Sequence, residues 1–317
     1  MQDIVSLVDH LVPGLLQGPR PSVACVCTTR PKYLVFDGDS TRPACVVEFG
    51  DELRLTRTDQ ILSRLQSRMP RGSVPVSLCC TEFQDGRYVH IQEGLGGVPW
   101  FRLTDNLKTP AAWRAFLGRA VAVMHRLHEA TRAMPAWTGT VDVAAELQRQ
   151  AAMCRRSGTP LADQVFRRVD EWSQALRDGV GSIPVWWQHG DFSLNNLLVS
   201  ADSVAIIDFE EFGGTHVPLS DGFGLALSVP LSQDGRCPLS IRECLAECVE
   251  QARLDEGIEA AYLPSLLMHH LLWRINQCHG IDRRSRLRDI LLGWARELAD
   301  SPGLFFEDPT TKMKVTR

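Results

Sequence analysis

The chain has 317 residues, enough for one large domain or two packed lobes with a substantial hydrophobic core. Its apolar fraction of 44% and charged fraction of 23% are those of an ordinary globular protein. The net charge of -4 provides no basic excess for binding nucleic acid or an anionic membrane, so we expect neither as a partner.

Two further sequence features bear on location and metal content. No apolar stretch approaches the ~20 residues that span a bilayer, and no basic segment precedes an apolar run at the start, so we expect a cytoplasmic protein. The ten cysteines include no CxxC pair, which argues against a zinc site. We expect them to be small buried hydrophobic residues in a reducing compartment.

Strands dominate the first part of the chain. Five segments rich in β-branched and aromatic residues are predicted as strands: 22–28, 32–36, 44–49, 74–78 and 87–92, the last two split by a turn at Asp85-Gly86. Between the third and fourth, apolar residues at helical spacing predict a helix over 56–68.

Glycines and a proline between residues 93 and 99 interrupt the strand pattern and predict a hinge. We therefore place an N-lobe at residues 1–93 and a C-lobe at residues 94–317. The second part is predicted to be mostly helical, with helices beginning near Pro110 and spanning 141–155, 161–176, 240–252, 260–277 and 282–299.

The segment 186–211 departs from this helical pattern. Its two apolar runs, 197–199 and 204–207, flank a polar turn and predict a β-hairpin centred near residue 202. Asn196 and Asp208 are equally far from that centre, so we expect them side by side at the open end. Asp191, in a loop led by Gly190, is expected to fold over the same end.

These three side chains would offer two carboxylates and one carboxamide. Such hard oxygen ligands suit Mg²⁺, with water and phosphate oxygens completing the coordination. The alternative is that Asp191 and Asn196 only cap a loop, since both residue types favour turns.

The motifs in this segment resemble those of a known family. Residues 189–196 read HGDFSLNN, which has the form HGDxxxxN, and IDFE follows at 207–210. This pair is similar to that of the aminoglycoside phosphotransferase and choline kinase family. The resemblance implies an α+β, two-lobed protein-kinase-like fold with a small antiparallel sheet in the N-lobe and a mostly helical C-lobe.

The resemblance also implies a function and residue roles. The function is transfer of the γ-phosphate of ATP or GTP to a hydroxyl of a small molecule (an antibiotic, a sugar or an amino alcohol) with Mg²⁺ as cofactor. Asp191 would be catalytic, Asn196 and Asp208 would hold the metal, and His189 and Asp221 would brace the loop. The residues expected to bind the nucleotide are Lys32, Gln92, Glu93 and Leu95.

One strand departs from the family pattern. The family carries a lysine on the third strand, paired with a glutamate on the following helix, whereas Glu48 stands near that place here. The helix position for its partner is expected near Thr58 or Asp59. Glu48 cannot hold phosphates, so its replacement is expected to be harmless. The candidate substitute cations are Lys32 first, then Arg30 and Arg42 in reserve.

Two rival interpretations remain open at this point. A degraded nucleotide lobe would make the chain a pseudokinase-like binding or regulatory module. Alternatively, Asp191, Asn196 and Asp208 could serve a metal-dependent hydrolase. The sequence leaves open the acceptor, the choice between ATP and GTP, and the oligomeric state.

Overall fold

The computed structural model describes residues 2–26, 30–84, 86–134, 137–232, 237–281 and 284–307. The end of the first predicted strand, Asp85 of the predicted turn and the start of the last predicted helix lie outside these ranges. The chain divides into two compact units. Unit 1 comprises Met1–Leu107, Ala122–Ala130 and Asn195–Phe212; unit 2 comprises Lys108–Val121, Thr131–Leu194 and Gly213–Arg317.

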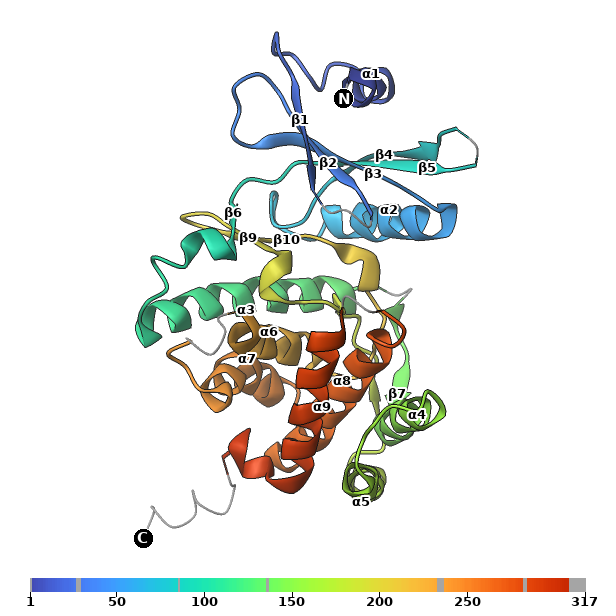
Figure 1. Ribbon diagram of the computed structural model, residues 1–317, viewed down its shortest axis with the longest axis vertical. Coiled ribbons are helices and arrows are strands. Elements are labelled where there is room, and N and C mark those ends of the chain that lie inside the picture. The colour runs from blue at the N-terminus through green and yellow to red at the C-terminus, as the bar shows by residue number, and fades with distance from the viewer. Residues whose placement is uncertain are drawn as a thin grey trace. The chain divides into compact units, whose positions relative to one another are not determined.

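Unit 1 contains an antiparallel sheet with strand order β1-β2-β3-β5-β4 (Figure 1). The strands are β1 (Ser22–Val26), β2 (Lys32–Phe36), β3 (Pro43–Gly50), β4 (Ser77–Glu82) and β5 (Tyr88–Glu93). The predicted strands are therefore present, with one clear shift in position. β4 begins three residues later than predicted, because Pro75 has no N–H to donate to a ladder.

The two faces of this sheet differ in chemistry. One face packs its apolar side chains, among them Val35, Val47 and Ile91, around Val8 of helix α1 (Gln2–Leu11), which the sequence analysis did not predict. Successive side chains of a strand alternate between faces. The row Lys32, Glu48 and His90, in register across β2, β3 and β5, therefore belongs to the other face.

Helix α2 (Glu52–Gln66) covers that second face (Figure 1). It begins four residues before the predicted helix, because the carboxylate of Asp51 caps it and accepts a hydrogen bond from the N–H of Arg54 at 2.9 Å. Its buried residues are Leu55, Thr58, Ile61, Leu62 and Leu65.

The predicted hairpin is present, but its register differs by one residue. Strands β9 (Leu197–Val199) and β10 (Val204–Ile206) are antiparallel, with β6 (Val98–Pro99) beside β9. The N–H of Ile207 donates to the carbonyl of Asn196 at 2.9 Å, so Asn196 lies opposite Ile207 and not Asp208. The turn closes from Ser200 to Ser203, which places its centre half a residue earlier than predicted.

Unit 2 is mostly helical, as predicted. Its helices are α4 (Val143–Arg156), α5 (Asp163–Gly179), α6 (Ser220–Ser232), α7 (Ile241–Asp255), α8 (Leu263–Gln277) and α9 (Ser285–Asp300). A two-stranded sheet, β7 (Thr140–Asp142) with β8 (Ser182–Pro184), accompanies them, and α3 (Pro110–Arg132) has residues in both units. Helix α6 is the one that Asp221 opens.

Every cysteine in the described ranges is free. Five of them are buried, namely Cys45, Cys154, Cys244, Cys248 and Cys278, whereas Cys25 is exposed. Among the helices described, none is both long and apolar enough to cross a membrane.

The central helix of unit 2 is α8, which is buried on nearly all sides and packs against α4 and α9. Two adjacent histidines lie within it. His270 shares a hydrogen bond of 2.7 Å with the Ser220 hydroxyl, whereas neither ring nitrogen of His269 has a hydrogen-bond partner among the described residues. Burial, together with the charge of Arg149, lowers the pKa of His269 to about 3.

We predict that His269→Leu stabilises the protein and that His270→Leu destabilises it. A buried polar group without a partner costs about 1–3 kcal/mol, which leucine would remove at position 269. At position 270 leucine would instead leave Ser220 unpaired. Urea unfolding at neutral pH measures both effects, and a less stable His269→Leu variant would contradict the assignment.

The lowered pKa of His269 also predicts how stability depends on pH. The folded-state pKa of His269 lies below the ordinary value of 6.5, so between pH 6.5 and about 3 the unfolded state binds a proton that the folded state does not. This difference leaves the free energy of unfolding unchanged above pH 6.5 and lowers it as the pH falls toward about 3. The loss approaches about 1.4 kcal/mol per pH unit within this window. His269→Leu should therefore lose less stability than the wild type between pH 7 and pH 5.

Candidate active site

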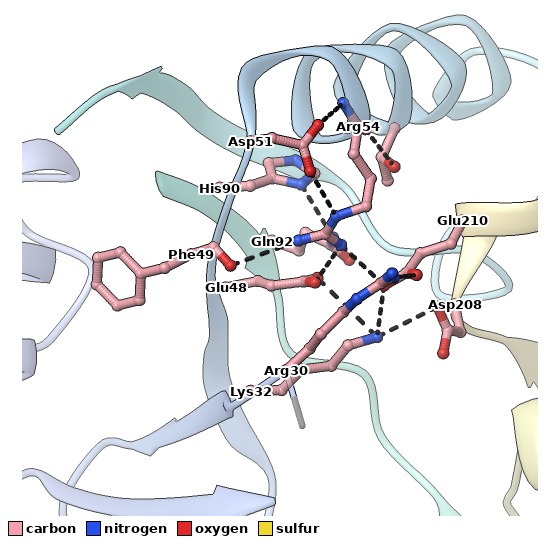
Figure 2. Close-up of polar contacts among 11 residues, drawn as sticks. Arg30, Lys32, Glu48, Phe49, Asp51, Arg54, His90, Gln92, Asp208 and Glu210 are labelled. Atoms are coloured by element: carbon pink, nitrogen blue, oxygen red, sulfur yellow. Dashed lines mark hydrogen bonds and ion pairs between the residues drawn. The ribbon is translucent and has the colours of Figure 1, made fainter. Parts of the chain in front are cut away.

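Six charged side chains of unit 1 are linked by ion pairs, and we call them the charged cluster (Figure 2). Its members are Arg30, Lys32, Glu48, Arg54, Asp208 and Glu210. They come from the segment before β2, from β2, β3 and α2, and from the segment that follows β10. Three members are basic and three are acidic, and Arg54 also lies 3.6 Å from the exposed carboxylate of Asp51.

Lys32 contacts all three acids of the cluster. Its Nζ lies 3.2 Å from Oδ1 of Asp208, and 3.9 Å from one carboxylate oxygen of each of Glu48 and Glu210. Burial alone would lower the pKa of Lys32, but the three carboxylates outweigh it and raise the pKa above the ordinary value. Lys32 is therefore an ammonium cation at neutral pH.

Asp208 directly follows β10 and has an unusual backbone and an unusual side chain. Its φ of 67° and ψ of 70° lie in the left-handed region. Its Oδ1 is buried, and the Lys32 ammonium is the charged group that approaches it, at 3.2 Å. An oxygen desolvated in this way is suited to a cation.

These oxygens fit the needs of Mg²⁺. The Asp208 carboxylate and the carboxamide of Asn196, which is 8% exposed at the start of the same hairpin, are hard donors. Within the described ranges, no group of three or more His, Cys, Asp or Glu side chains forms a ready metal site. Mg²⁺ does not require one, because it is usually held by one or two carboxylates plus phosphate oxygens.

Arg54 is a member of the charged cluster that the sequence analysis missed. Its Nη1 contacts the Glu48 carboxylate and lies 2.8 Å from Oε1 of Glu210. The side chains at the two helix positions expected to pair with β3 have other hydrogen-bond partners. Thr58 donates to the carbonyl of Arg54 at 3.0 Å, and Asp59 accepts from Ser77 at 2.5 Å.

The expected partner position was therefore wrong by about one helical turn. The helix was predicted to start at residue 56, which left Arg54 outside it, and an acid was sought where a base stands. The N-cap signal of Asp51, followed by Glu52 in the first turn, would have extended the helix to include Arg54.

The remaining residues expected to bind nucleotide lie along β5 and just after it. Gln92 Nε2 is 3.1 Å from Nδ1 of His90, and Leu95 is 4% exposed. Glu93 pairs with Arg42 at 2.9 Å, and Arg42 also donates to the carbonyl of Gly94. Both contacts of the Arg42 guanidinium are therefore with residues 93 and 94. Of the two reserve cations, Arg30 alone joins the charged cluster, through an ion pair with Glu210.

In unit 2, the loop that carries Asp191 is held by Asp221. The Asp221 carboxylate accepts hydrogen bonds from the N–H groups of His189 at 2.8 Å and Gly190 at 2.9 Å. Its own N–H donates to the side chain of Gln188 at 2.9 Å. Asp221 is 1% exposed and opens α6, where a negative charge interacts favourably with the helix N-terminus.

Asp191 itself is ion-paired with Arg274 of α8, with Nη2 2.9 Å from Oδ1. The guanidinium is 17% exposed and the carboxylate 30%, so the contact is partly shielded from water. Sequence reasoning did not find Arg274, which lies 83 positions further along the chain. Asp191 belongs to unit 2 whereas Asn196 and Asp208 belong to unit 1, so the convergence of the three stays a prediction.

The sequence matches a known protein family. The family described as "Phosphotransferase enzyme family" matches residues 31–234. No curated protein sequence matches the chain.

Solved structures show the same fold at low identity. A thermostable mutant of aminoglycoside phosphotransferase APH(4)-Ia with AMP-PNP and hygromycin B is 14% identical, with a TM-score of 0.64 over 95% of this chain and 99% of the other. Wild-type aminoglycoside 2'-phosphotransferase-IIIa with GDP is 14% identical, with a TM-score of 0.59 over 95% and 97%. A choline/ethanolamine kinase family protein from Mesorhizobium loti is 13% identical, with a TM-score of 0.57 over 96% of each chain. The predicted kinase-like fold is thereby confirmed.

We predict that Asp221→Asn loosens the loop around Gly190. An amide has one acceptor oxygen where the carboxylate has two, and its NH₂ group would face a backbone N–H. Losing a charge-assisted hydrogen bond costs about 1.5–3 kcal/mol, so the amides of His189 and Gly190 should exchange with solvent at least ~10-fold faster. Hydrogen exchange measures this directly. Asp289→Asn, an exposed change on α9, serves as control, and equal exchange in both variants would refute the bracing role.

Proposed function

This chain belongs to the phosphotransferase enzyme family, and on that basis we propose that it transfers the γ-phosphate of ATP or GTP to a hydroxyl of a small molecule, with Mg²⁺ as cofactor. The observation that carries the proposal is the contact between Lys32 and Asp208, 3.2 Å apart. It places an ammonium group beside the acid of the hairpin, and phosphoryl-transfer sites combine a lysine that binds the phosphates with an acid that holds the metal.

This contact also weighs against the rival interpretations. The missing lysine of β3 suggested a degraded nucleotide lobe, yet β2 provides a cation beside Asp208. A metal-dependent hydrolase would have no need of that cation or of a nucleotide-binding strand next to it. We therefore favour an active small-molecule kinase over a pseudokinase or a hydrolase.

Each residue has a role in the proposed reaction. Asp191 accepts the proton of the acceptor hydroxyl, and Arg274 holds its carboxylate in place. Lys32 binds the nucleotide phosphates. Asn196 and Asp208 would hold Mg²⁺, which when bound supplies charge neutralisation at the phosphate oxygens.

The bound molecules of similar proteins support the choice of substrates. The complexes named above contain AMP-PNP or GDP, and one contains hygromycin B. We extend this to a nucleotide donor and a small hydroxylated acceptor for the present chain. We further propose that it acts in the cytoplasm, with nucleotide bound by residues 1–93 and the acceptor by residues 94–317.

The direct test is Asp191→Asn. The change keeps the size of the side chain and removes the base, and loss of a general base typically lowers kcat by ~10²–10⁴-fold. Nucleotide consumption with Mg²⁺, screened over amino-alcohol, sugar and antibiotic acceptors, measures the effect. A folded variant with wild-type turnover would exclude Asp191 as the base, and a wild type that binds no nucleotide at millimolar concentration would refute the kinase.

A second prediction concerns the metal. Asp208→Asn should weaken Mg²⁺-dependent nucleotide binding more than Asn196→Ala does, because only Asp208 brings a charge. Asparagine is chosen at position 208 because it tolerates the left-handed backbone there. Calorimetric titration of nucleotide with and without Mg²⁺ separates the two variants. If Asp208→Asn retains the full Mg²⁺ enhancement, the assignment of Asp208 as a ligand is wrong.

A further inference from the structure

Unit 1 contains an ion pair whose polarity is the reverse of the one expected from the family pattern. The acid, Glu48, lies on β3 and the base, Arg54, lies on α2 (Figure 2). We propose that Arg54 is a positioning residue that occupies the carboxylates of Glu48 and Glu210, and thereby leaves the Lys32 ammonium free to serve Asp208 and the nucleotide phosphates. The proposal rests on the proposed function.

The distances show how the carboxylates are shared. Arg54 lies closer to Glu48 and Glu210 than Lys32 does, since Lys32 is 3.9 Å from each. The shortest contact of Lys32 is the one to Asp208, at 3.2 Å. Glu48 turns Oε1 to Arg54 and Oε2 toward Lys32, so at Glu48 each cation has its own oxygen. At Glu210 both cations approach Oε1, and Arg54 is the closer of the two, at 2.8 Å against 3.9 Å.

Burial explains why this division depends on Arg54. The side chains of Glu48 and Glu210 are 6% and 19% exposed, and Arg54 is itself 15% exposed. Removing one partner of a buried ion pair leaves a charge that must find another counter-ion. With Arg54 gone, Lys32 is the nearest remaining cation to Glu48, and the ammonium would be drawn toward the sheet and away from Asp208.

The neighbours of Glu48 reinforce the arrangement. Lys32 and His90 flank it in the register of β2, β3 and β5. Burial, opposed in part by Asp59 and assisted by the charge of Arg54, lowers the pKa of His90 to about 4, so His90 stays neutral and offers Glu48 no charge. The reversal of the pair has thus moved the phosphate-binding cation from β3 to the adjacent strand.

This assignment revises the expectation that Glu48 is dispensable. Glu48 was expected to be harmless to replace because its carboxylate would repel phosphates. It is buried and paired with Arg54, and its replacement would release Arg54 just as the loss of Arg54 releases Glu48.

The test measures two affinities by calorimetry, that of Mg²⁺·AMP-PNP or Mg²⁺·GMP-PNP, whichever the wild type binds, and that of the matching nucleoside. Arg54→Gln and Glu48→Gln should each weaken binding of the Mg²⁺-nucleotide about ten-fold, as expected for a disturbed contact to a charged group. Nucleoside affinity should not change, because the nucleoside has no phosphates. The double variant should be no worse than Arg54→Gln alone, because loss of Arg54 already removes the Arg54–Glu48 interaction.

Three further variants complete the design. Arg54→Lys keeps the charge and should recover part of the affinity for the Mg²⁺-nucleotide. Lys32→Ala measures how much affinity is lost when the proposed phosphate-binding cation itself is removed. Arg64→Gln, on the exposed side of the same helix, is the matched control and should bind like the wild type. Thermal unfolding identifies any variant that fails to fold, and if Arg54→Gln does so, Arg54→Lys and Glu48→Gln carry the test.

The outcomes are separable. Unchanged Mg²⁺-nucleotide affinity in folded Arg54→Gln, alongside a loss in Lys32→Ala, overturns the positioning role and leaves the proposed function standing. Equal losses for nucleotide and nucleoside also overturn it, because they indicate general damage to unit 1. A wild type that binds neither nucleotide refutes the proposed function instead.

Discussion

A carboxylate that is removed from water needs a counter-ion from the protein, and the carboxylate in this position in unit 1 is that of Glu48. The residue is 5% exposed on the face of β3 that α2 covers. A charge in such a place is tolerated only with a close counter-ion. The N-cap at Asp51 begins α2 early enough for Arg54 to fall in its first turn and meet this carboxylate. The position of Glu48 on β3 and the residue at which α2 begins together determine that Arg54 meets this carboxylate.

Unit 2 contains a buried acid that is accommodated by different means. Asp221 is 1% exposed and receives backbone N–H groups of the 189–190 segment at the start of a helix. Backbone donors have fixed directions, so they define the course of a loop, whereas the cations of unit 1 sit on long side chains that can move. Asp221 therefore fixes the main chain of a loop, whereas Glu48 is paired with cationic side chains.

Local patterns predicted much of this architecture. The strand β2 was predicted with its observed bounds, and the residues of the HGDxxxxN motif and of the hairpin were recognised because their spacing is fixed within one short segment. The hairpin register was missed by one residue, because a symmetric turn can be centred on a residue or between two residues. Helix α1 was missed because its short amphipathic pattern lies before the first strand and has no clear start signal.

The contacts between distant segments could not be predicted in this way. Arg54 with Glu210, and Arg274 with Asp191, join positions that no local period relates. A lysine at a known strand position was the expected signal, and its absence suggested loss of function. Here the same two elements carry side chains of opposite sign, Glu48 on β3 and Arg54 on α2, and only the three-dimensional arrangement reveals that they pair.

The backbone of Asp208 restricts the evolution of this position independently of any ligand. With φ at 67°, most side chains would strain the chain by about 1–2 kcal/mol, and glycine, asparagine and aspartate are the residues that adopt this conformation most readily. Two of these three carry an oxygen at the same distance from the main chain. Substitution at residue 208 is thereby biased toward glycine and two oxygen-bearing side chains, so the backbone alone favours an oxygen donor at this position whether or not a ligand is bound.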